Sequence, residues 1–106
     1  MEFEKAQIFD LAGSVDWSSG ATVSKMVIKK ETGNITLFSF DVGQSLSEHS
    51  APFDAFVLVT EGKGRIIIDK KPFDLSAGEF IVMPANIPHA VQALERFKMM
   101  LVMIKG

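Results

Sequence analysis

The chain has 106 residues, of which 47% are hydrophobic and 23% are charged, and its formal net charge is -2. This length suits one domain that holds its own core, and the small net charge gives no bias toward nucleic acid. Cysteine is absent, which excludes disulfides, thiolate metal sites and a cysteine nucleophile.

No targeting or membrane signal stands out. The first residues include acids where a signal peptide would have a basic region. The longest strictly apolar run, Met99 to Ile104, is far too short to span a bilayer. We therefore expect a cytoplasmic protein with no membrane and no nucleic-acid partner.

The N-terminal segment, residues 1–22, is the least regular part of the chain. Single apolar residues lie among charges, and Ser18, Ser19 and Gly20 end the pattern with turn residues. A short strand and a single turn of helix fit this pattern equally well.

From Val23 onward the apolar spacing shortens to that of strands. Alternation over Val23 to Lys30, turn residues over Glu31 to Asn34 and a second run over Ile35 to Val42 predict a hairpin. After a polar stretch, the apolar strand Phe56 to Val59 follows. The next residues, Glu61 to Gly64, give the strongest hairpin pattern in the chain, with the return strand at Arg65 to Asp69.

The last third predicts four more short strands, at Phe73 to Leu75, Phe80 to Met83, Ala90 to Leu94 and Phe97 to Ile104. Pro84 closes the second of these, and Pro88 precedes His89 at the start of the third. No segment shows a convincing helical apolar stripe. Short strands separated by turns favour an antiparallel sandwich or barrel.

Two stretches resemble the two motifs of the cupin superfamily of small barrels. The first family motif contains Gly, His-x-His, Glu and Gly at fixed intervals. This chain reproduces every interval with Gly43, His49, Ala51, Ala55 and Gly62.

The second family motif contains Gly, Pro-x-Gly, His and Asn. The corresponding residues here are Gly78, Pro84, Asn86, His89 and Ala93. Asn in place of Gly is a mild departure because Asn tolerates a left-handed backbone.

The resemblance implies an all-β, antiparallel jelly-roll β-barrel of the small single-domain, conserved-barrel type. Residues 1–106 would be one cupin domain, with the barrel over residues 23–106. In this family two His and one Glu of the first motif and the His of the second usually hold one divalent metal. Carried over by position, these ligands are His49, Ala51, Ala55 and His89.

A methyl group has no lone pair, so Ala51 and Ala55 cannot bind a cation. The resemblance therefore implies an incomplete metal site at His49 and His89, holding either no cofactor or a weakly held divalent metal (Zn, Ni, Fe or Mn). Glu48 and Asp54 are the nearby acids, and regular alternation points both away from His49. A bulge near Pro52 would turn Asp54 inward and complete a two-histidine, one-carboxylate set.

The pocket-lining residues on this alignment share the inner face of the barrel: His49, Ala51, Phe53, Ala55, His89 and Ala93. The leading function is small-molecule binding in the barrel, with a degenerate metal site and no assigned catalytic residue. The alternative is a metal-dependent isomerase or oxygenase that uses His49 and His89 with a non-standard third ligand.

Two further expectations concern packing. The Met and Phe residues are first of all core filler, among them Met83, Met99 and Phe80. We also expect a homodimer, because an N-terminal strand exchanged between subunits is common among small cupins, and Phe3, Ile8 and Trp17 would supply an apolar patch for it.

Overall fold

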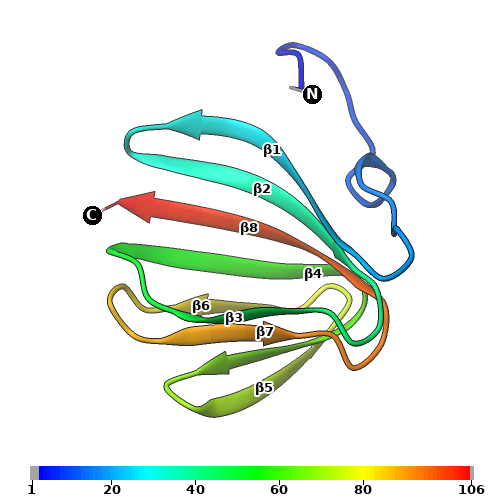
Figure 1. The fold of residues 1–106 in the computed structure, drawn as a ribbon. Coiled ribbons are helices and arrows are strands. Elements are labelled where there is room, and N and C mark those ends of the chain that lie inside the picture. Colours follow the sequence, from blue (N-terminus) through cyan, green and yellow to red (C-terminus); the bar gives the residue numbers. More distant parts are fainter. Residues whose placement is uncertain (1–2, 106) are drawn as a thin grey trace.

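The computed structural model describes residues 3–105; Met1 and Glu2 of the N-terminal segment and Gly106 of the barrel lie outside the described residues. Within this range the chain forms one 3₁₀ helix and a set of antiparallel strands (Figure 1). These elements are η1 (Ala12–Ser14), β1 (Thr22–Lys30), β2 (Gly33–Phe40), β3 (Ser45–His49), β4 (Phe53–Ile68), β5 (Lys71–Ser76), β6 (Phe80–Met83), β7 (His89–Gln92) and β8 (Phe97–Lys105).

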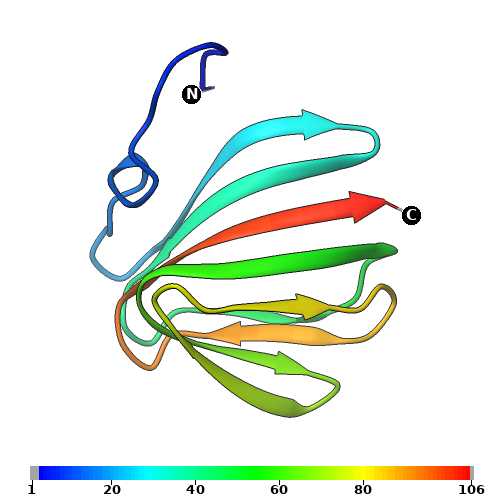
Figure 2. The same ribbon diagram turned by 180° about the vertical axis from the view of Figure 1, so that it is seen from behind.

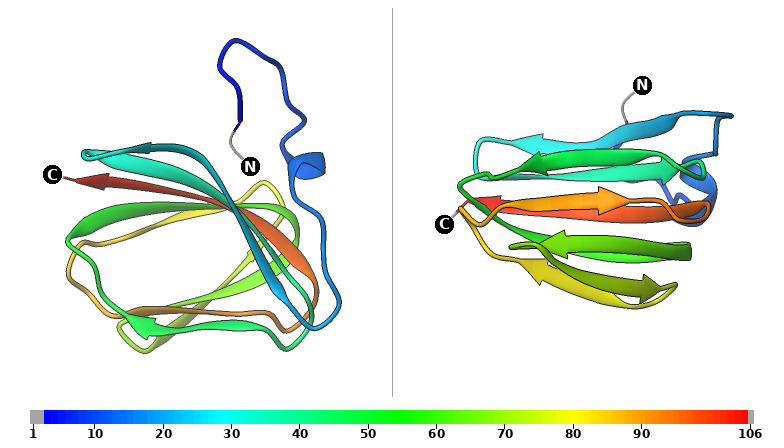
Figure 3. Two further views of the ribbon diagram at one scale, coloured as in Figure 1. Left: turned by 45° about the horizontal axis from the view of Figure 1, so that its top comes forward. Right: turned by 60° about the horizontal axis from the view of Figure 1, so that its bottom comes forward.

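The strands form two layers that share β4. The large sheet has the order β1-β2-β8-β4-β6, and the small sheet has the order β3-β7-β4-β5. Figure 3 shows the two layers curling around a common interior. The predicted all-β jelly-roll barrel is therefore confirmed. No helix in residues 3–105 combines the length and apolar character needed to cross a membrane.

The hairpin predicted at Glu61 to Gly64 is wrong, because residues 53–68 form one strand. The first half of β4 pairs with β6 and β8, and the second half pairs with β5 and β7. Figures 1 and 2 show β4 curling at one end of the molecule and continuing into the small sheet. The turn residues bend the strand from one sheet to the other and do not reverse it.

The bend in β4 is built on glycines that face Phe97. Gly62 has a φ of +76°, and a Cβ at this position would collide with the Arg96 carbonyl oxygen. A Cβ on Gly64 would collide with the Phe97 ring. The pairing of β4 with β8 also shifts register between Val59 and Glu61, which adds twist at the same corner.

The core lies between the sheets and alternates along each strand. On β4 the residues Ala55, Val57, Val59 and Ile66 are almost fully buried, and their neighbours Phe56 and Leu58 face outward. The rest of the buried apolar cluster is Phe40, Leu75, Met83, Val91, Ala93, Phe97 and Met99.

The prediction of core filler holds for Met83 and Met99 and fails for Phe80, which is 61% exposed. Phe80 pairs with Leu58 in the large sheet, and this register places both side chains on its outer face.

The N-terminal segment contains a single turn of 3₁₀ helix, which decides between the two alternatives left by the sequence. Lys98, on the outer face of β8, is only 5% exposed because this segment covers it. Its Nζ donates to the Ala12 carbonyl oxygen at 2.7 Å, pairs with Glu61 at 3.2 Å and lies 4.5 Å from the centre of the Trp17 ring. These contacts hold residues 12–17 against the barrel.

We predict that Gly62→Ala destabilises the protein by about 2–4 kcal/mol, since it combines a left-handed backbone with a collision at β8. The matched control is Gly43→Ala, where φ is +84° and nothing lies within 4 Å of the added Cβ. The control should lose only about 1–2 kcal/mol from backbone strain. Urea denaturation measures both, and equal losses would refute the collision.

Candidate functional site

His89 lies at the start of β7 on the inner face of the barrel. The loop between β6 and β7 places it there, and Asn86 in this loop has a φ of +65°, the left-handed conformation expected at the family's glycine position. Along β7, His89, Val91 and the following Ala93 share one side of the chain, and all three are at least 94% buried. The histidine therefore belongs to the wall of the interior.

A β-bulge in β3 aims His49 at His89. Leu46 pairs with Val91 and His49 pairs with His89, so Ser47 and Glu48 together oppose a single residue of β7. In a regular strand, positions 46 and 49 would point to opposite faces. The extra residue returns His49 to the face of Leu46 and turns Glu48 away from it.

The two imidazole rings face each other through their Nε2 atoms, which lie 3.2 Å apart. The Nδ1 of His49 lies 2.8 Å from the Ser47 carbonyl oxygen, and the Nδ1 of His89 lies 3.2 Å from that of Ile87. A carbonyl oxygen only accepts, so each Nδ1 carries the proton of its bond. In the neutral rings both Nε2 lone pairs then converge on one point.

Two converging lone pairs repel unless a positive or hydrogen-bond-donating group lies between them. A shared proton, the donor group of a ligand or a metal ion each satisfies this condition. Two nitrogens on one tetrahedral zinc lie about 3.3 Å apart, since each Zn–N bond is about 2.05 Å. The observed separation of 3.2 Å matches two ligands of one ion and also allows one shared proton, whereas a ligand donor about 2.9 Å from both atoms would lie to one side of the line that joins them.

The protein environment keeps His89 neutral. Burial lowers the pKa of His89 below its usual value; the bond to the Ile87 carbonyl opposes this shift, and a charge on His49 adds to it. His49 is exposed and opens the pair to solvent. The pair therefore consists of one exposed and one buried imidazole.

The four positions predicted to share one inner face, 49, 51, 53 and 55, do not lie on one continuous strand. β3 ends at His49 and β4 begins at Phe53, so Ala51 lies in the connection between them. The carbonyl oxygen of Ala51 accepts a bond from the Asn86 backbone N–H at 2.8 Å, which ties this connection to the β6–β7 loop. Phe53 is half-buried at the start of β4.

Ala55 and Ala93 lie in the packed core. Ala55 is 2% exposed and lies directly opposite Met83 on β6 and Met103 on β8. The two methionine side chains therefore flank the position where the family places a carboxylate. Ala93 is 3% exposed, and its backbone bonds to Gly43 and Gln44.

The two-histidine, one-carboxylate set required a bulge near Pro52 that turns Asp54 inward. The structure has a bulge in β3, between Leu46 and His49, and Asp54 binds the backbone of the β6–β7 loop. Its carboxylate accepts the Ala85 backbone N–H at 2.9 Å, while Glu48 pairs with Lys70 at 3.5 Å. Among residues 3–105, no three His, Cys, Asp or Glu side chains are grouped so that they could hold a metal ion.

The cupin domain family matches residues 36–105 of this chain. The chain belongs to the cupin family. No curated protein matches it.

Three solved structures illustrate the likeness of this cupin to others. A conserved protein of unknown function from Streptococcus pyogenes is 38% identical, with a TM-score of 0.93 over 98% of this chain and 91% of that one. A cupin 2 conserved barrel domain protein from Leptotrichia buccalis is 46% identical, with a TM-score of 0.89 over 92% of this chain and 47% of that one. This cupin thus spans about half the length of the Leptotrichia protein.

A cupin superfamily protein from Desulfitobacterium hafniense is 26% identical, with a TM-score of 0.90 over 97% of this chain and 94% of that one.

The family's four-ligand metal does not fit the residues of this cupin. His49 and His89 have suitable geometry, but the position of the carboxylate ligand is Ala55 between two methionines, and Ala51 offers only a methyl group. A retained divalent ion usually has three or more protein ligands.

We predict that lowering the pH through the titration of His89 destabilises this cupin. The folded-state pKa of His89 is lowered, whereas the unfolded value is about 6.5. The stability from a neutral His89 is therefore present above about pH 6.5 and is lost as the pH falls through the folded-state pKa. The pKa of Asp41 is lowered to about 2, so this carboxylate titrates well below that window.

Urea denaturation of the parent and His89→Asn at pH 5 and pH 7.5 measures this effect. The parent should lose stability at pH 5 by more than the variant does. Identical losses would show that His89 is not held neutral by the fold.

Proposed function

We propose that this cupin is a small-molecule-binding protein whose polar anchor is the pair His49 and His89. The single observation that supports it is the convergence of the two Nε2 atoms at 3.2 Å, with both Nδ1 atoms engaged by backbone carbonyls. The backbone bonds preorganise the rings, so little side-chain entropy is lost when a ligand binds.

The chemistry of the pair defines the ligand class. Two acceptor lone pairs select a group that donates hydrogen bonds or carries positive charge, such as an amine, an amide or a hydroxyl. The inner face next to the pair is apolar, since Leu46, Ile68 and Val91 pack into the core cluster. The ligand is therefore small and mostly apolar, with a donor group at one end.

The second candidate is a metal-dependent cupin enzyme of isomerase or oxygenase type that uses His49 and His89 with a non-standard third ligand. The Nε2 separation favours it, because it matches two ligands of one ion. The alanines at positions 51 and 55 count against it, so it remains the alternative.

Removal of either histidine should abolish ligand binding. Native mass spectrometry of protein purified without a metal-affinity tag should find an organic compound on the parent and none on His49→Ala or His89→Ala. Phe73→Ala, at a half-exposed position, is the control and should retain the compound. A parent that carries no organic compound would refute the proposed function.

The same samples test the alternative by elemental analysis. Stoichiometric zinc, nickel, iron or manganese in the parent, lost in both histidine variants, would overturn the leading proposal in favour of the metal-dependent one.

We also propose that the protein is a homodimer in which the N-terminal segment of one copy covers the other. Trp17 packs on its own barrel and so does not contribute to an intersubunit patch. Among the described residues of the segment, the exposed large apolar side chains are Ile8, which is fully exposed, Phe9 and Leu11. Exposed apolar side chains that are grouped in this way are typical of a surface that contacts another chain.

The outer face of the large sheet offers a complementary surface for a second copy. Its exposed apolar side chains come from three strands, β1, β6 and β8: Ile28, Phe80, Val82 and Ile104. Phe56 adds a ring 4.8 Å from that of Phe80.

Light scattering at micromolar concentration should give the mass of two chains for the parent. Ile8→Asp and Phe80→Asp should shift it toward the mass of one chain, because each places a charge in the apolar contact. Val42→Asp, at an exposed position between β2 and β3, should leave the dimer intact. A parent with the mass of one chain would refute the dimer.

A further inference from the structure

A hollow lies on the outer face of the small sheet, on the opposite side of that sheet from the histidine pair. It has a volume of about 230 Å³ and is lined by Lys63, Gly64, Arg65, Asp74, Leu94 and Glu95. Arg65 pairs with Gln92 of β7, one position along from the inward-facing Val91, so alternation directs Arg65 outward. The hollow is therefore separate from the barrel interior.

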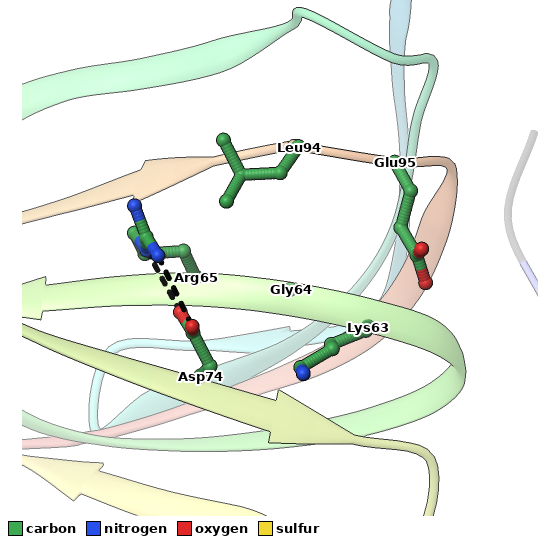
Figure 4. A pocket seen from close by; sticks show the side chains of 6 residues that line it. All are labelled: Lys63, Gly64, Arg65, Asp74, Leu94 and Glu95. Carbon is green, nitrogen blue, oxygen red and sulfur yellow. Dashed lines mark hydrogen bonds and ion pairs between the residues drawn. The ribbon is translucent and has the colours of Figure 1, made fainter.

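Figure 4 shows how the side chains surround this hollow. The Arg65–Asp74 pair stands at one side, Leu94 and Glu95 come from the connection between β7 and β8, and Lys63 lies below them. The backbone of Gly64 forms the floor, and a Cβ on this residue would collide with the Phe97 ring. The bare floor is thus a direct result of the bend in β4.

One pair of charges in the hollow is already matched. The Nε and Nη2 atoms of Arg65 donate to the two carboxylate oxygens of Asp74 at 2.8 and 3.1 Å. This two-point bond holds the guanidinium in a fixed orientation and leaves its Nη1 without a partner among the described residues. The Asp74 carboxylate raises the pKa of Arg65, and in turn the guanidinium lowers the pKa of Asp74.

Lys63 and Glu95 carry the other two charges of the hollow, and the Lys63 charge acts on Asp74 from a longer distance, where it helps to lower the pKa of that carboxyl. Within residues 3–105 neither Lys63 nor Glu95 forms a hydrogen bond or an ion pair through its side chain. Their charges are opposite, and they stand on the same side of the hollow, with the backbone of Gly64 between them and the Arg65–Asp74 pair (Figure 4).

We propose that this hollow binds a small zwitterion of the size of a free amino acid. Its carboxylate would contact Lys63 and the Nη1 of Arg65, its ammonium group would contact Glu95, and a short apolar side chain would lie on Leu94, which is 59% exposed. A volume of about 230 Å³ is below the range of about 300–1,000 Å³ typical of drug-sized ligands, so the ligand has few heavy atoms.

The charge pattern disfavours ligands with a single charge. A simple anion would meet the carboxylates of Glu95 and Asp74, and a simple cation would meet Lys63 and Arg65. A zwitterion satisfies both at once, although exposure of these groups to solvent limits each contact to a modest gain. We therefore expect millimolar affinity that weakens at high salt.

Nuclear magnetic resonance titration of the ¹⁵N-labelled protein with L-alanine tests the proposal. Saturable shifts should appear at the amides of Gly64, Arg65, Leu94 and Glu95. Acetate and ethylammonium, each carrying one of the two charges, should bind at least tenfold more weakly. Lys63→Ala and Glu95→Gln should each weaken L-alanine binding at least fivefold, because each removes one charged contact.

The matched controls are Lys29→Ala and Glu31→Gln, exposed charges at the β1–β2 hairpin far from the small sheet. They should bind L-alanine as the parent does. Absence of saturable shifts up to about 20 mM, equal binding of acetate, or unchanged binding in both site variants would each overturn the proposal. Since all four substitutions are at exposed or partly exposed side chains, the variants are expected to fold.

Discussion

The contact between the bent strand β4 and Phe97 is the constraint on which the rest of the structure depends. Gly64 brings the β4 backbone against the Phe97 ring, and Gly62 brings it against the backbone at Arg96 and Phe97, so no side chain fits at either position without displacing β8. The contact lets one strand serve both sheets, with β6 and β8 on its first half and β5 and β7 on its second. The two layers are thereby held by continuous backbone as well as by side-chain packing.

The histidine pair depends on this arrangement in a specific way. The second half of β4 supports β7, and Ile68 pairs directly with His89. β3 then pairs with β7, and its bulge sets the face on which His49 lies. The geometry of the pair is therefore determined by strand register and backbone carbonyls, with the methionines around Ala55 filling the space of the lost ligand.

The sequence predicted the architecture well because apolar alternation and turn residues report directly on strands. It placed the β1–β2 hairpin, the β6 strand and the position of His89 at the start of β7. It failed at Glu61 to Gly64, since glycine-rich turn residues permit a bend and a reversal equally, and only the pairing partners distinguish them. Apolar periodicity likewise could not show the bulge before His49. The extra residue in β3 moves His49 to the other face of the strand, and nothing in the residue types of β3 indicates that a residue is extra.

The candidate site was predictable in its residues and unpredictable in its geometry. Motif spacing singled out His49 and His89. The rings are oriented by the backbone carbonyls of Ser47 and Ile87, and since every residue has such a carbonyl, the sequence does not show which ones bind. The outer hollow could not be predicted for a related reason: Lys63 and Glu95 lie 32 positions apart, and both fall between predicted strands. The pairing of β4 with β8 brings their surroundings together.

The position of β8 in the large sheet also bears on how the chain acquires its structure. β8 lies between β2 and β4, yet both of these neighbours precede it in the chain. During synthesis the β1–β2 hairpin can form early, but it has no edge to join until residues 97–105 have left the ribosome. The sheet is thus completed by insertion of its latest-made strand between two earlier ones, a non-local step that slows folding. Until then, the edges of β2 and β4 are open to pairing with other chains.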